Sequence, residues 1–219
     1  MRKRVITYCP GSCGELIQGV IKGKELLISY PIELGTTLYI EFCRTENKIN
    51  LMPKMKSAIR KTLNFLGISE KYIERILIKR ESQLAFGKGM SSSTADVAST
   101  ILGIGALFNV ELDNNTIANI AVSIEPTDSI VFEKITLFDS LTGRVIIPLT
   151  PVPSFKVIVL EGRGNVDTLE YHSKINKALY SYAREWDDVY STMEKALKTG
   201  DWAKVGESAI RSARIQQKF

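Results

Sequence analysis

The segment from Gly87 to Asp96 reads GKGMSSSTAD and places two glycines and four hydroxyl side chains just before an apolar helical pattern. Apolar residues after Ser93 recur at spacings that a helix places on one face, so a helix is predicted to begin at the hydroxyl cluster. Its unpaired N–H groups and positive dipole end would point at an anion, and Gly87 and Gly89 would let the backbone approach it. Lys88 adds a cation. The segment predicts a phosphate-binding loop, with an ordinary capped helix start as the alternative.

Neither standard nucleotide-binding loop fits this segment. The pattern GxxxxGK[ST] needs an upstream glycine that is missing here, and GxGxxG fails because Ser92 stands where the last glycine should be. A phosphate site in this chain therefore belongs to another kind of loop.

Length and composition indicate a globular protein. The 219 residues suffice for one large domain or for a large and a small one, and 44% hydrophobic residues support a core. No run approaches the ~18 apolar residues that a membrane helix needs, and the first residues lack the apolar stretch of a secretion signal. We expect a cytoplasmic protein with no membrane partner.

Cysteine and histidine usage argues against two kinds of site. Cys9, Cys13 and Cys43 form no CxxC pair and His172 is the only histidine, so a zinc site has too few suitably spaced ligands. The single histidine also disfavours Ser/His or Cys/His nucleophilic catalysis.

The net charge is +5, and much of the positive charge lies between residues 54 and 80. Met55, Ile59 and Leu63 recur at helical spacing on the side opposite most of these charges, which favours a solvated helix face. The same surplus would attract an acidic ligand such as a nucleotide. Nucleic acid is not expected as a partner, because interleaved aromatic residues are lacking. The basic residues are Lys54, Lys56, Arg60, Lys61, Lys71, Arg75, Lys79 and Arg80.

Hydrophobic periodicity predicts an α+β chain. Strands are predicted at residues 5–8, 25–29, 36–43 and 74–82, two or three more within 129–149 around a turn at 141–143, and one at 155–162. Helices are predicted at 52–66, 92–108, 115–123, 167–198 and 201–217. Gly200 should end the fourth of these helices and Asp201 should begin the fifth. The best candidate for a domain boundary is the PVP sequence at 151–153.

Three segments together resemble the GHMP kinase superfamily of galactokinase, homoserine, mevalonate and phosphomevalonate kinases. They are CPGSCGELIQG near the N-terminus, GKGMSSSTAD, and EPTDSIVF at 125–132. The match is closest to the L-threonine kinase branch, which serves cobalamin biosynthesis, and it covers nearly the whole chain. The resemblance implies a GHMP-kinase fold, with a ribosomal-protein-like N-terminal ATP-binding domain at 1–150 and the start of a C-terminal α/β domain at 151–219. The C-terminal domain is expected to be incomplete, because nothing after Asp167 resembles the third, glycine-rich motif of the superfamily.

The resemblance also implies ATP and Mg²⁺ as cofactors. Asp128 matches the position of the catalytic aspartate or a neighbour of it, and would accept or orient the proton of the substrate hydroxyl. Ser93 and Glu125 would hold magnesium. A turn that caps the next strand is the alternative for EPTDS. The residues that match the phosphate loop are Gly87, Lys88, Gly89, Met90, Ser91, Ser92, Ser93 and Thr94.

Two further groups of residues are implied for the acceptor. Ser12, Gly14 and Glu15 belong to the first motif, which lines the substrate cleft in the superfamily; a glycine turn joining two strands is the alternative. Asp167 and Thr168 match a dipeptide of the threonine-kinase branch, and the carboxylate could bind the substrate ammonium. A helix N-cap is an equally good interpretation of Asp167, since Glu170 follows three residues later.

The implied activity is transfer of the γ-phosphoryl group of ATP to L-threonine, giving O-phospho-L-threonine. A kinase for homoserine or another small alcohol keeps the same fold. A non-catalytic nucleotide- or RNA-binding module is the alternative from a different class, favoured by the missing third motif and the positive charge. The oligomeric state is left open.

Overall fold

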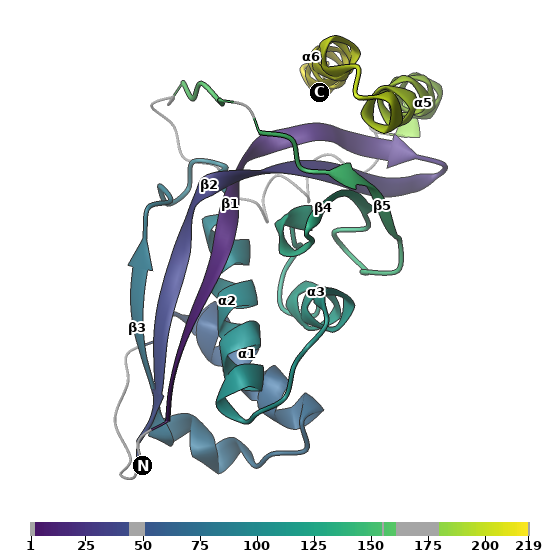
Figure 1. Cartoon of the computed structure of the whole chain (residues 1–219). Coiled ribbons are helices and arrows are strands. Elements are labelled where there is room, and N and C mark those ends of the chain that lie inside the picture. The colour runs from purple at the N-terminus through teal and green to yellow at the C-terminus, as the bar shows by residue number, and fades with distance from the viewer. Residues whose placement is uncertain (1–2, 44–50, 155, 161–179, 219) are drawn as a thin grey trace.

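The computed structural model describes residues 3–43, 51–154, 156–160 and 180–218. Its largest feature is a pair of long antiparallel strands, β1 (Lys3–Ile21) and β2 (Lys24–Phe42). The register between them shifts three times between Pro10 and Ile17, and both strands bend at this point, so that the second part of β1 and the first part of β2 cross above the helices (Figure 1). The first motif, expected next to a cleft or as a turn, is therefore the bent middle of a strand.

The other strands join β2 on two different stretches. β3 (Ile76–Ser82) pairs with the second half of β2, whereas β4 (Lys134–Phe138) meets its first half where Leu27 lies opposite Phe138. β5 (Ile146–Pro151) pairs with β4, so the described strands form one antiparallel sheet. The bend of β1 and β2 lies between these two stretches of β2. It divides the sheet into two parts that run in different directions.

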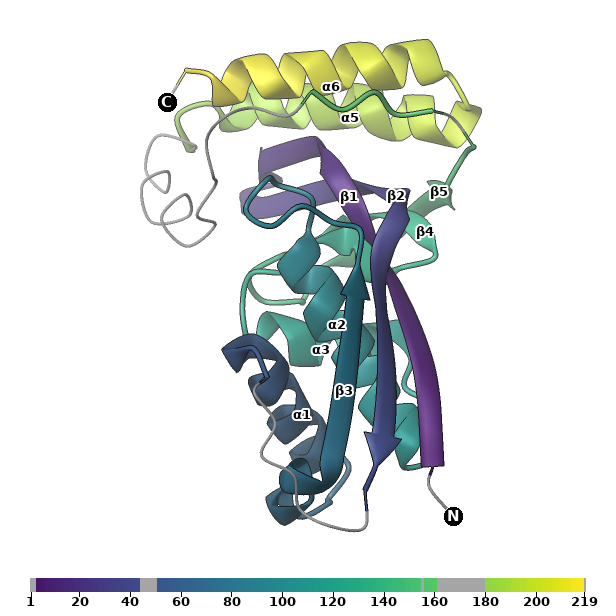
Figure 2. The same ribbon diagram turned by 90° about the vertical axis from the view of Figure 1, so that its left-hand side faces the viewer.

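Three helices cover one face of β1, β2 and β3 (Figure 2). They are α1 (Pro53–Phe65), α2 (Ser92–Leu107) and α3 (Asn114–Val122). α2 is buried on nearly all sides because it lies between the sheet and the other two helices, with Ile101 and Ile104 fully buried. Asp113 is the cap of α3, since its carboxylate accepts a hydrogen bond of 2.7 Å from the N–H of Thr116.

A helical hairpin covers the other end of the sheet. α5 (Ala183–Thr199) and α6 (Trp202–Gln216) lie across the second part of β1 (Figures 1 and 2). Gly200 ends α5 in a left-handed conformation with φ of 71°, and the Asp201 carboxylate accepts from the N–H of Lys204 at 3.2 Å to begin α6. Both predictions for this turn are confirmed.

Most predicted elements are present, with several differences. The strand predicted at 5–8 continues to Ile21, and the strands predicted at 25–29 and 36–43 are parts of one strand, β2. Residues 70–75 form a 3₁₀ helix, η1 (Glu70–Arg75), before β3 begins, and a second one, η2 (Ser129–Val131), precedes β4. The strand predicted at 155–162 is wrong over 156–160, where the chain is irregular and Ile158 and Leu160 are about nine-tenths exposed. No strand among the described residues pairs with this segment, and a β-branched sequence without a partner gains nothing from extending. The predicted helix at 167–198 can be followed from residue 180 only, and the rest lies outside the described residues.

Candidate active site

The loop between β3 and α2 alternates the sign of φ along its length. Gly87, Gly89 and Ser91 have φ values of 69°, 68° and 54°, whereas Lys88 and Met90 between them do not adopt positive φ. Backbone N–H groups in such an alternating stretch converge on a concave surface that binds anions. The stretch ends at the first turn of α2, where further N–H groups lack intrahelical partners. The backbone thus fits the predicted phosphate loop.

The bent part of β1 holds this loop in place. The N–H of Ser12 donates to the carbonyl of Met90 at 3.2 Å, and the hydroxyls of Ser12 and Ser91 are hydrogen bonded. A Cβ at Gly11 would lie 2.7 Å from the same carbonyl, so a glycine is needed for the approach. A left-handed serine costs on the order of 1–3 kcal/mol, and these contacts keep Ser91 there. The first and second motifs therefore form one structure.

Glu125 lies at the end of the segment after α3 and points at the start of α2. Its side chain is 7% exposed. One carboxylate oxygen accepts a hydrogen bond of 2.5 Å from the Ser93 hydroxyl, and the other forms an ion pair with the Lys54 ammonium group. Lys54 also donates to the Ser93 hydroxyl at 3.0 Å. The two residues expected to bind magnesium are in contact, and a cation lies against both.

Asp128, the predicted catalytic residue, lies beside the same helix start. The Thr94 hydroxyl is 3.4 Å from its carboxylate, and its backbone N–H is 3.4 Å from that hydroxyl. Burial raises the pKa of Asp128 above the ordinary value, while hydrogen bonds from Ser91 and Thr94 lower it and the charge of Glu125 raises it. A carboxylate with a raised pKa is a stronger proton acceptor than an exposed one.

A second carboxyl group faces Asp128 from the bend of β1. Burial and, to a smaller extent, the nearby charge of Asp128 raise the pKa of Glu15 to about 8, against a backbone hydrogen bond that lowers it. Gly14 beside it has a φ of 79°, which helps the strand turn at this point. Because two like charges at close range are unfavourable, the two carboxyl groups are favoured to share one proton near neutral pH.

The sequence analysis missed two basic residues at this site. Lys54 is predicted on a solvated helix face, and Arg80 lies in the strand predicted at 74–82. The structure instead places Arg80 in an ion pair of 2.7 Å with Asp96, a buried residue one turn into α2 that also accepts from Thr36 at 3.0 Å. Helical periodicity could not have found these contacts, because they are made across elements. One signal was available in the sequence: Asp96 is an acidic residue in a largely apolar helical segment directly after the loop. A buried acid requires a basic partner.

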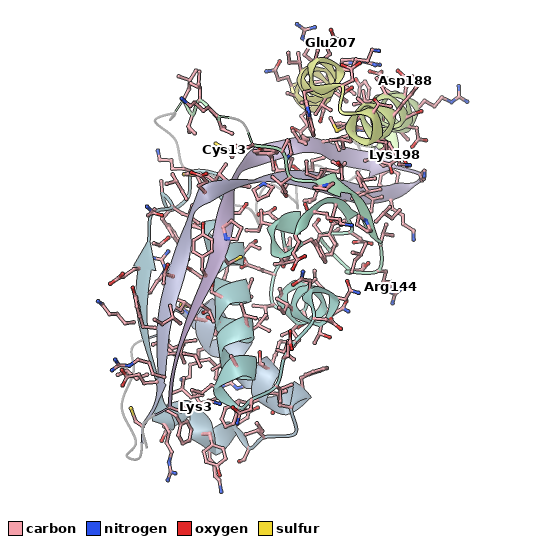
Figure 3. The ribbon with its side chains drawn as sticks, in the orientation of Figure 1. Lys3, Cys13, Arg144, Asp188, Lys198 and Glu207 are labelled. Carbon is pink, nitrogen blue, oxygen red and sulfur yellow. The ribbon has the colours of Figure 1, made fainter. Side chains whose placement is uncertain are left out.

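Asp167, Thr168 and His172 lie outside the described residues. Burial raises the pKa of the Cys9 thiol to about 12, so Cys9 is an unreactive core residue. Cys13 lies at the bend of β1, far from Lys3 at the other end of the strand (Figure 3). In the part of the chain that the structure describes, no group of three His, Cys, Asp or Glu side chains could hold a metal by itself, and no helix is long and apolar enough to cross a membrane.

Residues 51–132 match the family model for the GHMP kinases N-terminal domain. This range contains α1, the phosphate loop, α2, α3 and both carboxylates, Glu125 and Asp128. The chain is 32% identical over 213 residues to a protein from Salmonella typhimurium named L-threonine kinase, covering 97% of this chain and 70% of that protein. The protein of the same name from Citrobacter freundii is 33% identical over 217 residues, covering 97% and 73%.

The chain belongs to the GHMP kinase family. The mevalonate kinase of Methanococcus jannaschii has a similar fold, with a TM-score of 0.68 at 20% identity over 99% of this chain and 79% of that one. The predicted α+β fold and the resemblance carried by the three segments are confirmed. A GHMP kinase uses ATP as its phosphoryl donor, typically with Mg²⁺, and the alternating loop, the helix start and the oxygens of Ser93 and Glu125 suit both.

Proposed function

We propose that this GHMP kinase transfers the γ-phosphoryl group of ATP to the side-chain hydroxyl of L-threonine, giving O-phospho-L-threonine. The observation that carries the proposal is the convergence of the loop hydroxyls with Glu125 and Asp128 at the start of α2. The choice of acceptor is supported by 32–33% identity, over almost the whole chain, to two proteins named L-threonine kinase.

In this proposal the loop from Gly87 to Thr94 holds the phosphates of ATP. Backbone N–H groups of the alternating stretch and of the first turn of α2 supply the hydrogen bonds. Ser93 and Glu125 would hold Mg²⁺, with phosphate oxygens and water completing a set of hard oxygen ligands. The fit is supported by the Lys54 ammonium group, which contacts both side chains and marks a place where positive charge is stable. When bound, magnesium would neutralise charge on the transferred group.

Asp128 then receives or orients the proton of the threonine hydroxyl. Its raised pKa favours proton acceptance, and the Thr94 hydroxyl keeps its carboxylate fixed beside the loop. While Glu15 holds the shared proton, it adds no second negative charge next to the acceptor and can donate a hydrogen bond. No covalent intermediate on the protein is needed, because positioning and charge neutralisation carry phosphoryl transfer. That Asp167 and Thr168 contribute to acceptor binding stays a prediction, as does the division of the chain at residue 150.

The test measures ATP consumption and phosphothreonine with and without L-threonine and magnesium, for the unchanged chain and for Asp128→Asn. Threonine-dependent turnover is expected to fall by about a hundredfold or more in the variant, the order of a lost acid–base group. Thermal melting of both proteins checks that the variant is folded. Equal turnover in the two proteins would remove Asp128 from the chemistry, and faster turnover with homoserine than with threonine would replace the acceptor.

A further inference from the structure

Lys54 is delivered to the site by the first turn of α1. Pro53 begins the helix, and the buried side chains of Met55 and Ile59 fix its inner face against the core. The ammonium group reaches Ser93 and Glu125, whereas the side chain as a whole is 46% exposed. An anchored backbone with a long, partly solvated side chain lets the charged end move while the helix stays in place.

The Glu125 carboxylate requires a positively charged partner even when the Lys54 ammonium group moves away from it. Its carboxylate is almost completely buried, and removing the partner of a buried charge is strongly unfavourable. Its two oxygens are both occupied, one by the Ser93 hydroxyl and one by Lys54. A neutral hydroxyl offers no charge compensation, so Lys54 is the group in contact that balances Glu125.

A divalent cation held by Ser93 and Glu125 would compete with this ammonium group. Both would contact the same carboxylate and the same hydroxyl, and like charges a few ångströms apart repel strongly at the effective dielectric of a protein surface. The ammonium group must therefore leave when the metal binds. The strongest negative charge then within reach of a four-carbon side chain is the triphosphate over the neighbouring loop.

We propose that Lys54 is a phosphate-binding residue that exchanges partners with magnesium. Without metal its ammonium group neutralises Glu125 and faces the phosphates; with metal it is displaced from Glu125 and pairs with the phosphate oxygens. This role rests on the proposed function, because it takes ATP to lie on the loop at Gly87 to Thr94. Lys54 thereby keeps the site from presenting an unpaired carboxylate to a polyanion.

The test compares ATP affinity by titration calorimetry in excess magnesium and in EDTA, for the unchanged chain, Lys54→Met and Lys54→Arg. Lys54→Met is expected to weaken metal-free ATP binding by about tenfold or more, because Glu125 is then unpaired and faces the phosphates. Its loss with magnesium should be several times smaller, since the metal neutralises Glu125. Lys54→Arg keeps the charge and should stay within about threefold of the unchanged chain in EDTA.

Two further variants separate this role from a structural one. Lys56→Met removes an exposed lysine two positions along the same helix, which faces another direction, and should change neither affinity. In Lys54→Met combined with Glu125→Gln, metal-free affinity should recover part of the loss, because no carboxylate is left unpaired. Thermal melts confirm that each variant is folded.

The outcomes distinguish this role from the proposed function. If Lys54→Met loses equal ATP affinity in magnesium and in EDTA, or loses none in either, the role of Lys54 is overturned. Phosphothreonine formation by the unchanged chain would still support the proposed function. The expected affinity pattern without phosphothreonine formation overturns the acceptor and supports Lys54. An unchanged chain that binds no ATP overturns both.

Discussion

The bend of the β1–β2 pair and its hairpin-covered end differ in what they bury. At the bend, the Ser12 hydroxyl of β1 is hydrogen bonded to Ser91, the left-handed serine of the phosphate loop. Two carboxyl groups with a raised pKa, Glu15 and Asp128, lie in the same region. At the hairpin-covered end, β1 buries Ile17, Val20 and Ile21 against Trp186 and Val189 of the hairpin. One region holds carboxyl groups whose pKa is raised by burial, and the other packs mostly apolar side chains, although it also buries the Trp186 indole N–H without a hydrogen-bond partner among the described residues.

The first motif spans both regions, so its residues serve two purposes. Ser12 holds the phosphate loop, but Gly19 at the end of the same motif lies under the hairpin. A Cβ at Gly19 would lie 2.2 Å from the ring of Trp186. Gly19 is therefore required for packing, whereas Gly11 and Ser12 are required for the site.

Among the variants that test this difference, Trp186→Ala is expected to change the free energy of unfolding most. Trp186 is fully buried in the hairpin core, and truncating a buried tryptophan costs about 3–5 kcal/mol of the free energy of unfolding. Urea denaturation measures the loss. If the hairpin is only packed against the site, turnover per folded molecule should stay within about threefold of the unchanged chain, on the additivity expected of separate regions. A fall in turnover as large as that of Asp128→Asn would mean that the two regions are not separate.

A smaller effect is expected from Glu15→Gln, and it depends on pH. Because the pKa of Glu15 is raised from 4.5 to about 8 in the folded chain, the folded state holds a proton that the unfolded state has lost between these values. The free energy of unfolding of the unchanged chain must therefore fall across this range, and the glutamine variant lacks that fall. Relative to the unchanged chain, the variant should gain about 1 kcal/mol or more between pH 5 and pH 8.5. Parallel stability curves from thermal melts would show that Glu15 titrates normally.

The smallest effect is expected at the hairpin turn. Asp201→Ala removes the cap of α6, which costs about 1 kcal/mol on average, and should leave ATP affinity unchanged. Asp113→Ala is the matched comparison. It removes the same kind of cap from α3, and the chain after α3 leads directly to Glu125, so this variant is expected to weaken ATP binding. Calorimetric ATP affinity that falls in Asp113→Ala and not in Asp201→Ala would sharpen the distinction between the two regions. Equal effects on affinity would contradict it.

Local sequence signals predicted helices better than strands. α1, α2, α3 and α6 agree with their predicted ranges to within about one residue at each end, because periodicity and capping act within a few residues. β1 was expected as a short strand before a motif, yet it continues through Pro10 and Gly14 to Ile21. Strand length is set by pairing with β2, which the sequence of β1 does not contain.

The sequence by itself determined the chemistry of the loop and the kind of fold. Gly87, Gly89 and the hydroxyls after them indicated an anion site at a helix start, because positive φ and unpaired N–H groups follow from local backbone geometry. Only the tertiary structure brought Lys54 to Glu125, 71 positions along the chain, and Glu15 to Asp128. Charges so far apart in sequence interact only after the sheet bends and the helices pack, since electrostatic energy depends on distance and burial in space.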